Sequence, residues 1–219
     1  PWMVHRGSRT RPRDGRITFF ALTDNGTARL KQGRERAFRS HPFGAGTEGW
    51  TLLNAVPPAS PPSRRYHFQQ RLLWAGFGAI DTRLWIAPGY VDVAARFGDM
   101  LSSEELASLC AMQGVFLPVT DVMALIRKAW DVGHIRSLHQ AFLAEWESYQ
   151  PGEEALADLL RLAMAWADLL RADPGLPDRL FDEDWPSARS AATFQRLFPE
   201  LQKAGDAGLL ALYTHTRKY

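Results

Sequence analysis

Arginine is the residue type whose spacing in this sequence most directly suggests chemistry. Near the N-terminus, four arginines flank the turn signal Asp14-Gly15: Arg9, Arg11, Arg13 and Arg16. Because β-prone residues follow this turn, we expect residues 2–5 to pair with residues 16–21 across an arginine-rich tip. A guanidinium group offers a forked set of donors that matches phosphate oxygens. The pattern therefore predicts a hairpin that contacts a nucleic-acid backbone, as the wing of a winged helix-turn-helix does.

The distribution of charge along the chain supports this interpretation. Residues 1–40 hold ten Lys and Arg against three Asp and Glu, whereas residues 41–219 hold 16 against 21. The net charge of +2 therefore combines a basic N-terminal segment with an acidic remainder. A basic segment attracts polyanions through its local field. From charge alone, a solvated arm is an equally good interpretation, and phosphate contacts give affinity without sequence choice.

Other residue types give little support for catalysis or metal binding. Cys110 lies in an apolar run, where we expect a buried, inert thiol. The six histidines do not cluster, and His134 and His139 fall on different sides of one helix. The chain has no H-E-x-x-H, C-x-x-C or G-x-S-x-G motif. We therefore expect no catalytic residues, no metal site and no enzymatic activity.

Two other motifs have simpler explanations than ligand binding. Residues 44–49 fit G-x-G-x-x-G, but a dinucleotide site needs a strand before this motif and a helix after it. Here a strand-like segment follows, so we expect a flexible linker and no cofactor. The triplet Asp182-Glu183-Asp184 precedes Trp185-Pro186. Carboxylates at a helix N-terminus explain it better than a metal site does.

Composition sets the class of protein. The 219 residues are 46% hydrophobic and 23% charged, which is ordinary globular composition and excludes a disordered tail or a collagen-like repeat. A single cysteine excludes an intrachain disulfide and fits a reducing cytoplasm. No apolar run approaches the roughly 20 residues of a membrane span, and no signal peptide is recognisable. The chain begins at Pro1, so we expect that its original start was removed or that upstream residues are missing.

The predicted elements alternate and then become helical. After the hairpin, Thr23 is placed to cap a short helix over residues 24–37. Strands are expected at 50–56, 83–87 and 106–119, with helices at 64–75 and 91–101 between them, which predicts an α+β sandwich close to a split βαβ unit. Residues 120–219 show apolar stripes at helical spacing. The third of these stripes, expected to be core, comprises Leu156, Leu159, Leu160, Ala163 and Ala167.

Several motifs together resemble the PaaX-type transcriptional regulators. Gly15-Arg16 followed by Leu22-Thr23-Asp24-Asn25-Gly26 resembles the family's G-R-x-x-x-[YF]-x-L-T-x-x-G wing segment. Further blocks follow in the family's order: Trp50-Thr51-Leu52-Leu53, Leu72-Leu73-Trp74-Ala75-Gly76-Phe77-Gly78, Leu84-Trp85-Ile86-Ala87-Pro88, Ala129-Trp130-Asp131, Asp173-Pro174-Gly175-Leu176-Pro177 and Asp184-Trp185-Pro186. The joint order of these blocks is more specific than any one of them.

The resemblance implies an α+β multidomain protein. Its parts would be a winged-helix wing remnant at residues 1–40, a ferredoxin-like middle domain at 48–119 and an all-helical C-terminal domain at 120–219. It further implies a cytoplasmic bacterial repressor of an aromatic-acid catabolic operon, which binds operator DNA as a homodimer and is released by an acyl-CoA such as phenylacetyl-CoA. The arginines at the hairpin would contact the DNA. In the family the recognition helix precedes the wing, so most of the helix-turn-helix is expected to be missing from this chain.

The resemblance does not place the effector site. Trp130, Trp146 and Trp166 are candidates for lining an aromatic-accepting cavity, although their positions on helical faces favour core packing. Two alternatives of other classes are a ligand-binding or dimerisation module without DNA binding, and a small acyl-CoA-handling enzyme. The middle domain is also similar to CRISPR-associated ferredoxin-like nucleases, but Asp81 alone would hold a catalytic metal poorly.

Overall fold

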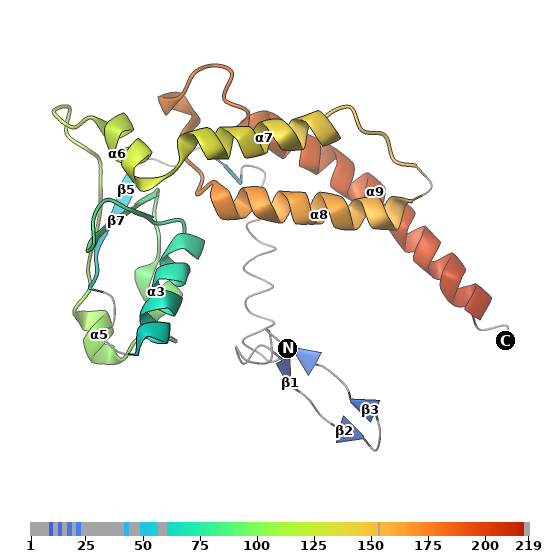
Figure 1. The fold of residues 1–219 in the computed structure, drawn as a ribbon, viewed down its shortest axis with the longest axis horizontal. Coiled ribbons are helices and arrows are strands. Elements are labelled where there is room, and N and C mark those ends of the chain that lie inside the picture. The colour runs from blue at the N-terminus through green and yellow to red at the C-terminus, as the bar shows by residue number, and fades with distance from the viewer. Residues whose placement is uncertain are drawn as a thin grey trace. The chain divides into compact units, whose positions relative to one another are not determined.

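The chain divides into two compact units, Pro1–Ser40 and His41–Tyr219. The computed structural model describes residues 9–10, 13–14, 17–18, 21–22, 42–43, 49–56, 61–152 and 154–216, with side chains described between residues 42 and 205. The described part of the first unit consists of short paired strands, and the second unit contains a sheet and seven helices in its described residues (Figure 1).

A four-stranded antiparallel sheet forms the centre of the second unit. Its strands are β5 (Trp50–Asn54), β6 (Gly78–Ala79), β7 (Leu84–Pro88) and β8 (Cys110–Gly114). Their order across the sheet is β6-β7-β5-β8. Helix α3 (Pro62–Trp74) connects β5 to β6, and the short helices α4 (Val93–Phe97) and α5 (Ser103–Ala107) connect β7 to β8. This β-α-β-β-α-β order is the split βαβ arrangement, which confirms the ferredoxin-like fold.

One face of the sheet packs against α3, α4 and α5. Alternation along β5 assigns the sides: Leu53, paired with Trp85 of β7, faces these helices, whereas Leu52 faces the opposite side. On α3, Phe68 and Leu72 are spaced i, i+4 and are both buried, as the apolar period predicts. The core on this face comprises Leu53, Ala55, Phe68, Leu72, Phe77, Trp85, Ala87, Phe97 and Leu101.

The other face of the sheet is covered by the C-terminal part of the chain. Helix α6 (Val122–Ala129) and the start of α7 (Val132–Trp146) pack there. The core on this face comprises Trp50, Ile80, Ile86, Ile126, Ile135, Leu176 and Trp185. Gly78 permits the close approach of β6 to α6, because a Cβ at this position would lie 2.6 Å from Trp130 Cε2. The sheet and the helical region therefore share a core.

Three long helices form the remainder of the described chain. Helices α7, α8 (Ala155–Ala172) and α9 (Ser187–Thr216) all contact one another (Figure 1). A 3₁₀ turn, η1 (Asp178–Leu180), lies between α8 and α9. The carboxylates of Asp121 and Asp131 cap α6 and α7 by accepting hydrogen bonds from the backbone N–H groups of Ala124 and His134, each at 2.9 Å. The predicted helical C-terminal region is confirmed.

Helix α8 buries a different face from the one predicted. Its buried residues are Ala155, Asp158, Leu162, Trp166 and Leu169. The predicted stripe lies elsewhere, and its member Leu160 is 59% exposed. The prediction was wrong because α8 is apolar around most of its circumference, so the period identifies a helix without deciding which stripe packs. The buried stripe is the one that contains Trp166, whose ring stacks on Phe194 of α9 with ring centroids 4.2 Å apart.

The segment 91–119 also differs from the prediction. The helix expected over 91–101 is limited to α4, and α5 begins after Ser102, which forms a capping box with Glu105. The strand expected over 106–119 is limited to β8. Cys110 is exposed at the start of this strand, and the expected burial is wrong because β8 is the outermost strand of the sheet.

Candidate functional site

The described part of the first unit is an antiparallel hairpin. Its strands are β1 (Arg9–Thr10), β2 (Arg13–Asp14), β3 (Ile17–Thr18) and β4 (Ala21–Leu22). The pairs Arg9↔Leu22 and Asp14↔Ile17 belong to one continuous register, with Gly15-Arg16 between the inner pair. A hairpin is therefore confirmed, but β3 and β4 pair with β2 and β1 and not with residues 2–5, which lie outside the described residues. Two residues that begin with Gly are enough for a tight hairpin turn. The residues directly before this turn are therefore the pairing partners of those directly after it.

Two of the four arginines expected to contact DNA lie in strands of this hairpin. Arg9 is in β1 and Arg13 is in β2. Arg11 and Arg16 lie outside the described residues, as does the helix expected over residues 24–37 with its N-cap Thr23. The hairpin thus brings Arg9 and Arg13 onto the arm that leads to the turn.

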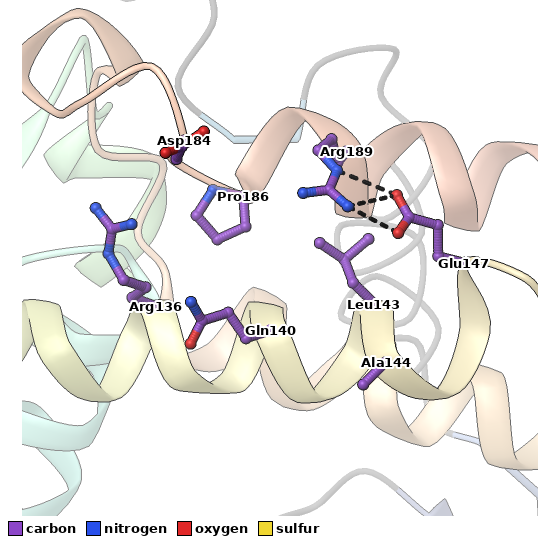
Figure 2. Close-up of a pocket in the computed structure, with 8 residues that line it drawn as sticks. All are labelled: Arg136, Gln140, Leu143, Ala144, Glu147, Asp184, Pro186 and Arg189. Atoms are coloured by element: carbon purple, nitrogen blue, oxygen red, sulfur yellow. Dashed lines mark hydrogen bonds and ion pairs between the residues drawn. The ribbon is translucent and has the colours of Figure 1, made fainter.

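A second candidate site is a cleft in the second unit between α7 and the start of α9 (Figure 2). Its volume is about 440 Å³. The lining residues are Arg136, Gln140, Leu143, Ala144, Glu147, Asp184, Pro186 and Arg189. Pro186 and Leu143 lie between the two arginines, so an apolar strip separates two cationic groups (Figure 2).

Both arginines of the cleft are held by carboxylates. The Arg189 guanidinium donates to both oxygens of Glu147, at 2.7 Å and 2.9 Å from Nη2. Arg136 donates to Asp182 at 2.6 Å and lies 5.0 Å above the Trp185 ring. Because each cation is already neutralised, the cleft offers paired charges and not a free cationic field. It suits a ligand with both polar and apolar parts better than a bare polyanion.

Asp182, the first residue of the acidic triplet, binds a neighbouring helix instead of capping α9. Helix α9 begins at Ser187, after Pro186. The carboxylate of Asp182 pairs with Arg136 of α7, and Ser187 donates its hydroxyl to Asp178 at 2.7 Å. The triplet itself lies in a turn, in which the Trp185 N–H donates to the Asp182 carbonyl oxygen at 3.1 Å.

The three tryptophans considered for an effector site lie in different surroundings. Trp130 packs over Gly78 and beside Trp50, with ring centroids 6.4 Å apart. Trp146 is fully buried beneath the guanidinium of Arg161, which lies 5.5 Å from its ring. Trp166 is 2% exposed and sits within the three-helix core. Trp146 and Trp166 are buried in the core, whereas Trp130 is partly buried against the core on one face of the sheet.

A charged cluster fixes the corner between α7 and α8. Tyr149 donates its hydroxyl to the carboxylate of Asp158, and Arg161 donates to the same carboxylate at 2.6 Å. These two hydrogen bonds, that of Tyr149 first, lower the pKa of Asp158, while the Asp158 partner raises the pKa of Tyr149. The cluster places Arg161 above Trp146.

The sequence patterns did not anticipate a buried polar network between the three long helices. His139 Nδ1 lies 2.9 Å from the Ser190 hydroxyl, and His139 Nε2 lies 3.2 Å from Asp173 Oδ2. The other oxygen of Asp173 accepts hydrogen bonds from the backbone N–H groups of Gly175 and Leu176. The residue types are those of a Ser-His-Asp triad.

This network is closed to substrates. His139, Asp173 and Ser190 are each 0% exposed, and the Phe43 ring packs edge-on against His139 at 4.8 Å. A nucleophile without solvent access cannot meet a substrate, so the network positions helices and is not a catalytic site. The only signal in the sequence was the Asp173-Pro174-Gly175 turn, in which Gly175 has a φ of 91°.

The chain just before the linker expected at residues 44–49 packs against the helical region. Pro42 and Phe43 are buried, and Phe43 contacts Trp166 with ring centroids 5.2 Å apart. Gly49 has a φ of 80°, and a Cβ there would lie 2.8 Å from the carbonyl oxygen of Gly114. Pro42, Phe43 and Gly49 are therefore anchored, and the flexible linker expected between them stays a prediction. Residues 44–48 lie outside the described part.

Asp81 has a structural role in the turn before β7. Its carboxylate accepts hydrogen bonds from the N–H groups of Arg83 at 2.7 Å and Leu84 at 2.8 Å. These two amides lower its pKa. Among the described residues, no group of three or more His, Cys, Asp and Glu side chains is arranged to hold a metal ion.

The helical region matches a known domain. Residues 130–211 match the PaaX-like protein C-terminal domain. The region from the end of α6 to α9 is therefore similar to the C-terminal domain of PaaX-like proteins. The resemblance seen in the sequence motifs is thereby confirmed for the helical region. The matched range contains the His139 network and the residues of the cleft.

The fold is shared with a solved structure. The uncharacterized protein Rv0674 from Mycobacterium tuberculosis superimposes with a TM-score of 0.61 at 21% sequence identity, over 94% of this chain and 80% of that chain. This similarity establishes the fold. No curated protein matches the chain at a significant level. Within the described residues, every helix is too short or too polar to cross a membrane.

Proposed function

We propose that this protein is a cytoplasmic transcriptional repressor of an aromatic-acid catabolic operon of the phenylacetate type. An acyl-CoA such as phenylacetyl-CoA would release it from operator DNA. The observation that carries this proposal is the match of residues 130–211 to the PaaX-like C-terminal domain. The arginine-bearing hairpin in the first unit supports it, because such a hairpin offers phosphate contacts.

In this proposal the hairpin binds the DNA backbone. Arg9, Arg11, Arg13 and Arg16 would each neutralise phosphate charge, and the rest of the first unit would orient the hairpin on the duplex. Phosphate contacts supply affinity that falls steeply with salt. Choice of sequence requires contacts to base edges, which these arginines do not supply from phosphate positions.

The shared core of the second unit provides a route for regulation. The PaaX-like domain contributes Ile135, Leu176 and Trp185 to the core on one face of the sheet. A ligand that favours one arrangement of the helices therefore also acts on the sheet through packed side chains. In a homodimer, an acyl-CoA that binds one arrangement better would change the spacing of the two hairpins relative to the operator half-sites.

The test is a titration of promoter DNA with the full chain. We expect binding to a fragment from the protein's own operon, measured by fluorescence anisotropy, and release of that DNA by phenylacetyl-CoA. Phenylacetate and free CoA are the matched controls and should leave the affinity unchanged. If no acyl-CoA changes the affinity, the effector part is wrong. Binding of phenylacetyl-CoA with no DNA binding would favour a ligand-binding module instead.

A further inference from the structure

Strand β8 is an exposed edge of the sheet. It pairs with β5 along its full length and, among the described residues, no strand pairs with its other side. All five of its residues are exposed, including Met112 at 58%. The exposure continues past the strand, where Val115, Leu117 and Val119 are 77%, 69% and 89% exposed.

This edge lacks the features that usually prevent strands from pairing. Sheet edges are commonly protected by charged side chains, proline or bulges. The chain has no charged residue between Glu105 and Asp121, and β8 contains no proline. The register of β8 with β5 runs without a bulge from Cys110 to Gly114. An uncharged, regular edge of this kind is a template on which another strand can pair.

We propose that β8 pairs antiparallel with β8 of a second copy, about a two-fold axis at Met112. The two four-stranded sheets then form one continuous sheet, with main-chain hydrogen bonds across the axis. In this register Cys110 lies opposite the partner's Gly114, and Ala111 lies opposite the partner's Gln113. The inference rests on the homodimer of the proposed function and identifies its interface.

A second copy fits this surface better than a charged partner does. An uncharged strand that meets itself brings no like charges together, and it offers nothing to attract an acidic or basic partner.

The flanking apolar residues would add to the area that such a dimer buries. A five-residue strand is only about 17 Å long, whereas stable interfaces bury about 800 Å² on each partner. Val115, Leu117 and Val119 extend the apolar surface beyond the strand. Strand pairing sets the register, and burial of these side chains stabilises it.

The competing surface is the exposed stripe of α8. Leu160 and Met164 are 59% and 69% exposed there. Charged residues interrupt this stripe: Arg161 pairs with Asp158, and Arg171 pairs with Asp168. Met164 therefore provides a matched control for Met112, since both are exposed methionines on the same unit.

The experiment measures the oligomeric state of the full chain by sedimentation velocity over a range of concentrations. We expect a dimer for the wild type. Met112→Lys places two like charges at the axis and should raise the dimer dissociation constant by about tenfold or more. Met164→Lys should leave it unchanged. If Met164→Lys weakens the dimer and Met112→Lys does not, the proposed interface is wrong but the homodimer stands. A wild type that stays monomeric would overturn the homodimer as well.

Disulfide trapping gives a second, independent readout. In a Cys110→Ser background, Met112→Cys should form a disulfide-linked dimer on mild oxidation, because facing residues of antiparallel strands lie within disulfide range. Met164→Cys in the same background should stay unlinked. Linking through position 164 and not 112 would overturn the proposal. A thermal melt tests whether each variant is folded. If Met112→Lys does not fold, disulfide trapping still tests the interface.

Discussion

At the scale of single residues, the side chains with the largest structural effect are buried polar groups. Asp173 binds His139 through one oxygen and two backbone N–H groups through the other, with no exposure to water. It therefore joins α7 to the connection that follows α8. Removing one partner from such a network leaves the other groups buried without hydrogen bonds. The free-energy cost of these unsatisfied groups exceeds the net stabilisation that the hydrogen bonds contributed.

Asp173→Ala is expected to lower the free energy of unfolding by about 3 kcal/mol. The loss comes from His139 and from the N–H groups of Gly175 and Leu176, which the variant leaves without an acceptor. Urea denaturation followed by circular dichroism measures the change. Asp168→Ala is the control, because this carboxylate is 61% exposed and surface pairs contribute at most about 1 kcal/mol. Equal losses in the two variants would contradict the structural role of Asp173.

At the scale of elements, an ion pair joins two of the helices that cover the sheet. Arg64 of α3 donates two hydrogen bonds of 2.6 Å to Glu105 of α5. The hydrogen bond from Arg64, and then that from the Ser102 N–H, lower the pKa of Glu105 to about 2. Because the folded-state pKa is depressed, the ionised carboxylate stabilises the fold above its ordinary pKa of 4.5. This contribution is lost as the pH falls through the folded-state value.

Glu105→Gln is expected to make the protein less stable near neutral pH and to lose this acid dependence. The stability difference between wild type and variant should narrow as the pH falls from about 4.5 to about 2. Urea denaturation at several pH values in this window measures it. Glu104→Gln changes an exposed carboxyl on the same turn and should keep the wild-type profile. A difference that stays constant with pH would show that the Glu105 charge does not act in this way.

The sequence correctly predicted the elements whose apolar pattern fits only one type of secondary structure and one buried face. Helix α3 and strands β5 and β7 follow from their apolar period and from the turns that bound them. The buried face of α8 did not follow, because the helix has two apolar stripes and only the position of Phe194 selects between them. The exposure of Cys110 depends on the order of strands, which is a property of the tertiary fold.

Among the candidate sites, those set by local sequence were predictable and those set by tertiary packing were not. The hairpin was predictable because a turn signal and its flanking residues are local in sequence. The His139 network was not, because Asp173 and Ser190 are separated from His139 by whole helices. Likewise the cleft depends on how Arg136 and Arg189 are brought together by the packing of α7 against α9.

At the scale of the whole molecule, the position of charge is more informative than its total. The first forty residues carry a net charge of +7 (ten basic, three acidic), and the rest carry −5 (16 basic, 21 acidic). A polyanion responds to the local field and not to the net charge of +2. If the hairpin arginines bind phosphates, DNA affinity must depend on where positive charge is removed.

Two variants with the same total charge separate these possibilities. One replaces Arg9, Arg11, Arg13 and Arg16 with Ala, and the other replaces four exposed cations of the second unit: Arg83, Arg127, Lys128 and Lys203. Each phosphate contact contributes about 0.9 to the slope of log affinity against log salt. The hairpin variant should therefore lose about 3 to 4 from that slope, whereas the control variant should keep it. Anisotropy titrations at several salt concentrations measure both slopes. Equal losses would mean that DNA senses only the total charge, and a retained slope in the hairpin variant would place the DNA contacts elsewhere in the chain.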